Sequence, residues 1–271
     1  MAISKIKVKT GIEIAYEDTG GTGVPIIFSH GLFMNHTMFA PQLEEFAKSW
    51  RCITWDERGH GDTRSSGHFN YWDSANDLLA LMDALNIDRA IHVGMSQGGI
   101  LGIRASMLAP ERFVGIVQLA TQVGKLAEEG AAVFKEITDD WMANGIDEGK
   151  QEFLKDLILG PGVDDTYWRQ YWAQLSPDQL DDALSALFSI DEMYHRLHEV
   201  TVPVLTIHGT ADVSTPHELA ERMAAGVVDS RGVVLIENGP HGVNLSHPDQ
   251  VNAALRKFFA ELVEENPDIR N

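Results

Sequence analysis

The sequence predicts an α/β domain: a mostly parallel sheet with helices on both faces, interrupted by one helical insertion. Within residues 1–121, strand-like and helix-like patterns alternate, as they do when crossover helices connect parallel strands. Within residues 122–200 no strand-like run occurs, and the pattern is helical and rich in aromatic residues. Because the strand pattern returns after residue 200, we assign residues 1–121 and 201–271 to the core and residues 122–200 to the insertion.

The composition is typical of a soluble globular protein. Of the 271 residues, 44% are hydrophobic and 23% are charged, and the net charge is −19. This charge, without any cluster of Lys and Arg, disfavours nucleic acid as a partner. No apolar run approaches the ~18 residues of a membrane span, and no signal-peptide pattern is present. We therefore expect a cytoplasmic protein that binds neither nucleic acid nor membrane; its oligomeric state stays open.

The secondary-structure elements follow from the spacing of apolar residues. Two short alternating runs predict an antiparallel hairpin at residues 5–10 and 12–16. Mainly apolar runs, typical of strands buried on both faces, occur at residues 25–29, 51–55, 90–93, 113–119, 202–208 and 232–236. Helical spacing occurs in the core at residues 38–49, 70–86, 100–109, 216–223 and 248–264. The single cysteine, Cys52, lies in a strand pattern and is expected to be buried.

The most informative stretch is Gly94-Met95-Ser96-Gln97-Gly98. It follows a strand pattern and precedes a helical pattern, which is the context of a nucleophile elbow. The two glycines let the strand and the helix pass each other closely. The turn exposes the Ser96 hydroxyl beside the N-terminus of the helix, where backbone N–H groups face any negative charge. We therefore expect Ser96 to be a catalytic nucleophile; the alternative is a glycine-rich turn without chemistry.

A serine hydroxyl needs a base to accept its proton and a third group to orient that base. Asp212 and His241 both follow later strands, so the chain offers a nucleophile, an acid and a base in the order Ser, Asp, His. The loop at residues 120–122, a rival position for the acid, holds no carboxylate. Among the 11 histidines, His247 is the serious rival to His241 as the base.

The oxyanion formed during acyl transfer needs two hydrogen-bond donors. We expect one to be the backbone N–H of Gln97, directly after the nucleophile, and the other to come from the loop after the strand at residues 25–29. Leu32 is the preferred second donor and Phe33 the alternative. His30, which precedes this loop, is interpreted as a structural residue that connects loops.

The insertion begins at the carboxyl end of a strand, so it is expected to cover the site as a lid with an apolar pocket. The alternative is a helical subdomain whose aromatic residues pack only on one another. Four aromatic residues are candidates for contact with substrate: Phe33, Trp141, Trp168 and Tyr171.

These motifs together resemble the α/β-hydrolase superfamily, in its serine-nucleophile branch, over essentially the whole chain. Within it, the turn at Asp56–Gly61 and the loop at Gly209–Pro216 look most like the 3-oxoadipate enol-lactonase and esterase group. The resemblance implies an α/β-hydrolase fold with an eight-stranded, mostly parallel sheet and a helical lid. It also implies hydrolysis without a cofactor or a metal.

Two departures narrow the resemblance. Pro240 precedes His241, where the superfamily usually has glycine. Leu32-Phe33-Met34 lacks the proline that is usual in haloalkane dehalogenases, epoxide hydrolases and perhydrolases. Dehalogenases and epoxide hydrolases also use Asp at the position of Ser96, so their chemistry is set aside.

We therefore expect a cofactor-free serine hydrolase that cleaves a carboxylic ester or lactone with an apolar part, through an acyl-enzyme on Ser96. A C–C bond hydrolase or a perhydrolase with the same triad is the alternative among enzymes. A small-molecule receptor that keeps the triad is the alternative among binding proteins. The sequence does not identify the ester.

Overall fold

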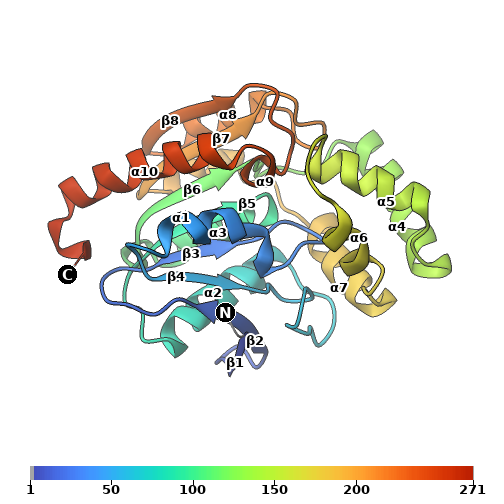
Figure 1. Cartoon of the computed structure of the whole chain (residues 1–271), viewed down its shortest axis with the longest axis horizontal. Coiled ribbons are helices and arrows are strands. Elements are labelled where there is room, and N and C mark those ends of the chain that lie inside the picture. Colours follow the sequence, from blue (N-terminus) through green and yellow to red (C-terminus); the bar gives the residue numbers. More distant parts are fainter. Residues whose placement is uncertain (1–2, 271) are drawn as a thin grey trace.

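The computed structural model describes residues 3–270 and contains one eight-stranded sheet (Figure 1). The order of the strands is β1-β2-β4-β3-β5-β6-β7-β8. The pairs β1–β2 and β2–β4 are antiparallel, whereas strands β3 to β8 run parallel to one another. The strands are β1 (Ser4–Lys7), β2 (Glu13–Asp18), β3 (Ile26–Ser29), β4 (Cys52–Trp55), β5 (Ala90–Met95), β6 (Phe113–Leu119), β7 (Pro203–Gly209) and β8 (Asp229–Ile236). The predicted fold class, mostly parallel with an antiparallel hairpin at one edge, is confirmed.

Helices cover both faces of the sheet. The core helices are α1 (Ala40–Phe46), α2 (Tyr71–Ala84), α3 (Gln97–Leu108), α8 (Glu218–Gly226), α9 (Val243–Ser246) and α10 (Pro248–Glu265), with short 3-10 turns at η1 (His36–Phe39), η2 (Pro110–Arg112) and η5 (Pro267–Arg270). Alternate residues of one strand enter different cores, because side chains of a strand point to opposite faces. Ile26 and Phe28 pack in the cluster that contains α1 and α10, and Ile27 packs in the cluster of α2, α3 and α8.

Two element boundaries show which local signals set them. α2 begins at Tyr71 because Asn70 caps it: the Asn70 side chain accepts from the Asp73 N–H, and the Asp73 carboxylate accepts from the Asn70 N–H. β8 begins at Asp229, before the predicted start at residue 232. Residues 229–231, which the prediction left out of the strand, are polar because β8 is an edge strand. Arg231 forms ion pairs there with Asp229 and Glu265.

Every regular element within residues 122–200 is a helix, and the insertion lies beyond the carboxyl ends of the parallel strands, at the right of Figure 1. It leaves the core after β6 and returns before β7. Its helices are α4 (Glu128–Asn144), α5 (Glu148–Leu154), the π-helix η3 (Lys155–Leu159), α6 (Thr166–Trp172), α7 (Pro177–Phe188) and the 3-10 helix η4 (Tyr194–Glu199).

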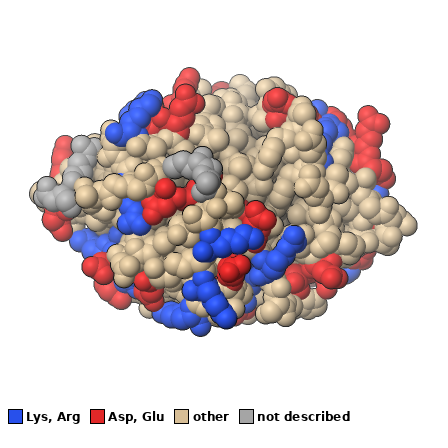
Figure 2. Space-filling view, turned by 60° about the horizontal axis from the view of Figure 1, so that its bottom comes forward, with Lys and Arg blue, Asp and Glu red and all other residues tan. Residues whose placement is uncertain are grey.

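Charged side chains are interspersed on the face shown in Figure 2, where Lys and Arg lie among Asp and Glu and large areas carry neither. None of the helices within residues 3–270 has both the length and the apolar character needed to span a membrane. The buried location expected for Cys52 is found, and burial raises the pKa of its thiol to about 12.

Candidate active site

Ser96 lies in a strained turn between β5 and α3. Its backbone angles are φ 51° and ψ −115°, a region that costs a non-glycine residue on the order of 1–3 kcal/mol. Steric constraints require glycine on both sides of the serine. A Cβ on Gly94 would lie 2.3 Å from the Gly98 carbonyl oxygen, and a Cβ on Gly98 would lie 2.1 Å from the Ser29 carbonyl oxygen. The strand, the turn and the neighbouring strand β3 therefore approach one another at the serine.

Asp212 and His241 form a hydrogen-bonded pair in the loops after β7 and β8. The distance from Asp212 Oδ2 to His241 Nδ1 is 2.7 Å. The other carboxylate oxygen accepts from the N–H groups of Ser214 (2.9 Å) and Thr215 (2.8 Å). Burial favours a raised pKa for Asp212, but the charge of His241 and the hydrogen bonds from His208 and His241 outweigh it and hold this pKa well below its usual value. With Nδ1 engaged, Nε2 is the nitrogen of His241 available to the cavity that it shares with Ser96.

A second histidine contacts the same carboxylate. His208 Nε2 lies 3.0 Å from Asp212 Oδ2 and 2.9 Å from the Thr215 carbonyl oxygen. A carbonyl oxygen can only accept, so Nε2 carries the proton and donates to both oxygens. The sequence placed His208 inside a strand and gave it no contact with the acid. Its position four residues before Asp212, across a tight turn, was the available signal.

The two residues predicted to supply oxyanion donors have backbone N–H groups without a hydrogen bond in the described chain. Among residues 3–270, neither the N–H of Leu32 nor that of Gln97 has a hydrogen-bond acceptor. Leu32 follows β3 in a turn closed by a hydrogen bond from the Met34 N–H to the Gly31 carbonyl (3.1 Å). Both residues line the cavity that contains Ser96. The N–H groups that the sequence singled out thus have no acceptor within residues 3–270, and their role as oxyanion donors stays a prediction.

A cavity of about 730 Å³ lies between the core and the insertion. Ser96, Gln97 and His241 are in its wall, among mostly apolar side chains. Both parts of the chain supply these side chains, for example Leu32, Met95 and Ile100 from the core and Phe134, Phe153 and Leu187 from the insertion. Side chains of the insertion therefore line the same cavity as Ser96, and a mainly apolar pocket with few polar groups is typical of a small-molecule site. That the insertion opens as a lid stays a prediction.

Comparison with known proteins identifies the family. Residues 24–248 match the family model of the alpha/beta hydrolase fold. The chain belongs to this family. It is 28% identical to a bifunctional esterase/perhydrolase of Acinetobacter calcoaceticus, over 94% of this chain and 98% of that protein. It is 27% identical to a non-heme chloroperoxidase of Streptomyces lividans, over 93% of this chain and 98% of that protein.

Solved structures agree with the fold. The enol-lactonase of Burkholderia xenovorans superposes with a TM-score of 0.82 and 20% identity, covering 95% of this chain and 100% of that one. The superfamily resemblance drawn from the sequence motifs is therefore confirmed, and the chain is an α/β-hydrolase.

The aromatic residues predicted to contact substrate occupy different environments in this α/β-hydrolase. Phe33 lines the cavity. Trp141 does not, and instead packs edge-on against Phe33 with ring centroids 5.1 Å apart. Trp168 is buried against Tyr171 outside the cavity wall. A helical insertion must bury aromatic residues for its own packing, and residue type alone does not reveal which ring faces the site.

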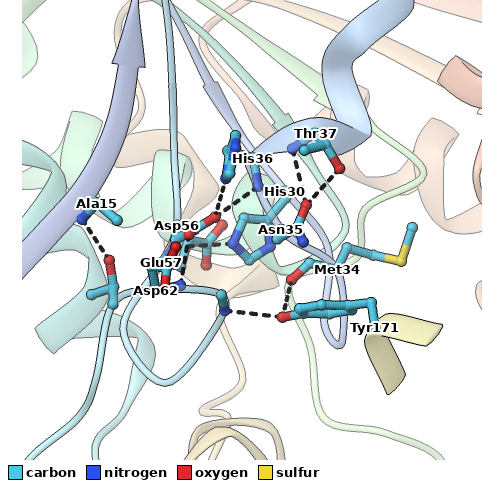
Figure 3. A network of polar contacts seen from close by, with 12 residues as sticks. Ala15, His30, Met34, Asn35, His36, Thr37, Asp56, Glu57, Asp62 and Tyr171 are labelled. Atoms are coloured by element: carbon cyan, nitrogen blue, oxygen red, sulfur yellow. Dashed lines mark hydrogen bonds and ion pairs between the residues drawn. The ribbon is translucent and has the colours of Figure 1, made fainter. Parts of the chain in front are cut away.

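Tyr171 belongs to a polar network that joins α6 to two core loops (Figure 3). Its hydroxyl donates to the Met34 carbonyl (3.1 Å) and accepts from the Gly61 N–H (2.9 Å). Burial raises the pKa of this hydroxyl above its usual value. Tyr171 therefore holds loops together rather than lining the cavity.

Asp56 is the centre of the same network. Its Oδ1 accepts from the backbone N–H (2.9 Å) and Nδ1 (2.7 Å) of His36, and its Oδ2 accepts from the Asp62 N–H (2.8 Å). Burial favours a raised pKa for Asp56, but the hydrogen bond and charge of His36 prevail and lower it. Asp56 therefore fixes its own turn to the loop that contains His36. Within the described residues, no cluster of His, Cys, Asp and Glu is arranged to hold a metal ion.

Proposed function

We propose that this α/β-hydrolase cleaves carboxylic esters or lactones through an acyl-enzyme on Ser96. The observation that carries the proposal is the Asp212–His241 pair, 2.7 Å apart, which opens onto the same cavity as Ser96. The N–H groups of Leu32 and Gln97, residues of the same cavity wall, support the remaining requirement of acyl transfer, which is a place for the oxyanion.

The first half-reaction forms the acyl-enzyme. His241 Nε2 accepts the Ser96 proton as Oγ attacks the carbonyl carbon, and the oxyanion is held by the N–H groups of Leu32 and Gln97. Collapse of this intermediate breaks the C–O bond, and the leaving alkoxide takes the proton from His241. In the second half-reaction His241 removes a proton from water, hydroxide attacks the ester carbon, and the proton returns to Ser96 Oγ. Asp212 stabilises the imidazolium ion in both halves.

The cavity favours an ester with a bulky apolar part. A volume of about 730 Å³ with mostly apolar walls is far larger than an acetyl group needs and falls in the range of drug-sized ligands. Apolar surface of the substrate that enters this cavity leaves water, which stabilises the complex by roughly 0.8 kcal/mol for each buried methylene. Substrates with longer apolar chains are therefore preferred.

Perhydrolysis is the second candidate, because a relative that is 28% identical is named an esterase/perhydrolase. Hydrogen peroxide would then replace water in attacking the acyl-enzyme and release a peracid. The absence of the proline usual in perhydrolases, at Leu32-Phe33-Met34, favours hydrolysis. The same triad is also compatible with C–C bond hydrolysis and with a small-molecule receptor.

The test is a series of p-nitrophenyl esters with acyl chains of increasing length. We expect kcat/KM to rise with chain length, by at most about fourfold per methylene. Ser96→Ala should lower kcat by about 10⁴-fold or more. Ser106→Ala is the matched control, since Ser106 lies on the same helix, outside the cavity, and its hydroxyl donates to the Ile103 carbonyl (2.8 Å).

Turnover that survives Ser96→Ala at the wild-type rate would refute the proposal. Peracid formation from acetate and hydrogen peroxide, measured in parallel, decides between hydrolysis and perhydrolysis. Single-turnover acylation followed by very slow release of product would favour the receptor instead.

A further inference from the structure

A buried carboxyl group lies behind the proposed oxyanion donors. Glu57 follows β4 and is 1% exposed, and its Oε2 accepts a hydrogen bond from Gln97 Nε2 at 2.9 Å. Gln97 is itself buried and is the residue directly after Ser96. Its side chain is therefore fixed by Glu57, and its backbone N–H is one of the two proposed oxyanion donors. In the proposed acyl transfer only that N–H acts, and the side chain has no role.

His60 confirms how the Gln97 amide is oriented. His60 Nδ1 lies 3.0 Å from the Arg58 carbonyl and must donate to it, so a neutral ring leaves Nε2 as an acceptor. This Nε2 lies 3.4 Å from Gln97 Nε2. The Gln97 amide nitrogen thus faces two acceptors, Glu57 and His60. The reversed amide would place its oxygen against His60 Nε2, which has no proton to donate.

The main chain of Glu57 supports the other donor. Its N–H donates to His30 Nε2 (3.0 Å), and His30 Nδ1 donates to the Gly31 carbonyl (2.8 Å). The Gly31 carbonyl and the Leu32 N–H belong to one peptide unit, so a donor on the oxygen orients and polarises the N–H. The two proposed oxyanion donors lie in different loops, and both are connected by hydrogen bonds to Glu57.

We propose that Glu57 is a positioning residue for the oxyanion hole: its carboxyl group fixes Gln97, and its backbone N–H fixes the Leu32 peptide through His30. The inference rests on the proposed function. It adds a residue that does not line the cavity and that touches no reacting atom.

Glu57 acts in its neutral form. Burial raises the pKa of Glu57 well above its usual value, and the charges of Asp77 and Asp56 act in the same direction against the hydrogen bond from Gln97. Its Oε1 is buried without a hydrogen-bond partner in the described chain, which disfavours a carboxylate there. A neutral acid differs little from an amide, so glutamine is the conservative replacement.

The experiment compares Glu57→Leu, Gln97→Leu and Glu57→Gln in p-nitrophenyl ester hydrolysis, with active sites counted by a fluorophosphonate. We expect both leucine variants to lose about 10- to 100-fold in kcat per active site, less than the 10²- to 10³-fold typical of deleting a donor outright. KM should stay within about twofold, because the oxyanion exists only in the transition state. Glu57→Gln should retain kcat within about threefold, because its carbonyl still accepts from Gln97.

Two further measurements separate positioning from general destabilisation. A trifluoromethyl ketone, whose adduct carries an oxyanion, should bind more weakly to both leucine variants. The factor by which its affinity falls should match the factor by which kcat falls. The double variant Glu57→Leu/Gln97→Leu should be no slower than Gln97→Leu alone, since both substitutions remove one contact. Cys52→Ala is the matched control: it loosens buried β4 without touching the cavity, and its kcat per active site should be unchanged.

An unchanged kcat in soluble Glu57→Leu or Gln97→Leu overturns the inference, as does an equal loss in Glu57→Gln and Glu57→Leu. If Glu57→Leu does not fold, the other two variants carry the test. Absence of ester turnover in the unmodified protein overturns the proposed function together with this inference. Turnover that depends on Ser96 but not on these variants overturns this inference alone.

Discussion

Three buried histidines should make the stability of this α/β-hydrolase fall sharply in mild acid. Burial lowers the pKa of His30 to about 3, that of His60 to about 4 and that of His92 to about 3. In the unfolded chain a histidine has a pKa of about 6.5. Below that pH the unfolded chain binds protons that the folded protein does not. The contribution of these three histidines to the free energy of unfolding is therefore fully present above the unfolded pKa. It is lost as the pH falls from about 6.5 toward 4.

The size of the effect follows from the linkage relation. At pH 5.5 an unfolded histidine is about ten-elevenths protonated, so each buried group changes the free energy of unfolding by about 1.2 kcal/mol per pH unit. From pH 7.5 to 5.5 each removes about 1.4 kcal/mol, and the three together remove about 4 kcal/mol. His36, whose pKa is raised by Asp56 against the effect of its burial, and Glu57, whose pKa is raised by burial, act in the opposite direction.

Equilibrium urea unfolding at pH 5.5, 6.5 and 7.5 measures this dependence. His92 isolates one group, because it is fully buried in β5 and its Nε2 lies 2.9 Å from Ser29 Oγ. In His92→Gln the change of unfolding free energy with pH at pH 5.5 should be smaller by about 1.2 kcal/mol per pH unit. Thr54→Val, a buried substitution without a titrating group, should leave the dependence unchanged. An identical pH dependence in His92→Gln and wild type would refute the reasoning.

Two other substitutions test the strain at the nucleophile and the second partner of the acid. Ser96→Gly should raise the free energy of unfolding by about 1 kcal/mol, since glycine tolerates φ 51°; the melting temperature should rise by about 2–4 °C, and a decrease would contradict the strain. His208→Phe should lower kcat about tenfold, because Asp212 loses a donor, but far less than the ~10⁴-fold expected for Asp212→Asn. Ester kinetics check this, and unchanged kcat in soluble His208→Phe would contradict it.

The sequence predicts those parts of the site whose chemistry admits few residue types. The elbow can be predicted from the sequence because Gly94 and Gly98 have no room for a Cβ and because the strained turn between them carries a serine. The positions of Asp212 and His241 can be predicted because parallel strands bring their carboxyl ends to one edge of the sheet, however far apart the two residues lie along the chain. Their hydrogen bond in the structure joins loops that only the topology makes neighbours.

The supporting residues are harder to predict, because their contacts depend on side-chain direction across different elements. Glu57 lies beside the acidic turn at Asp56, where it is most simply interpreted as a solvated carboxylate, yet it is fully buried against Gln97. His208 occupies a buried strand position, which is also the position of an inert core histidine. In both cases the partner is identified only when two loops are placed in space.

The aromatic residues of α6 (Thr166–Trp172) show what the insertion does besides forming the cavity wall. The Tyr171 hydroxyl donates to the Met34 carbonyl (3.1 Å), the Trp172 Nε1–H donates to the Phe33 carbonyl (2.9 Å), and the Tyr167 hydroxyl accepts from Asn35 Nδ2 (2.9 Å). All three partners lie in the loop that follows the proposed donor Leu32. A movement that carried α6 away from the core would break these three hydrogen bonds, and the one from the Gly61 N–H to Tyr171, and would disturb that loop. The aromatic residues of α6 therefore influence the site through the position of this loop, and none of them lies in the cavity wall.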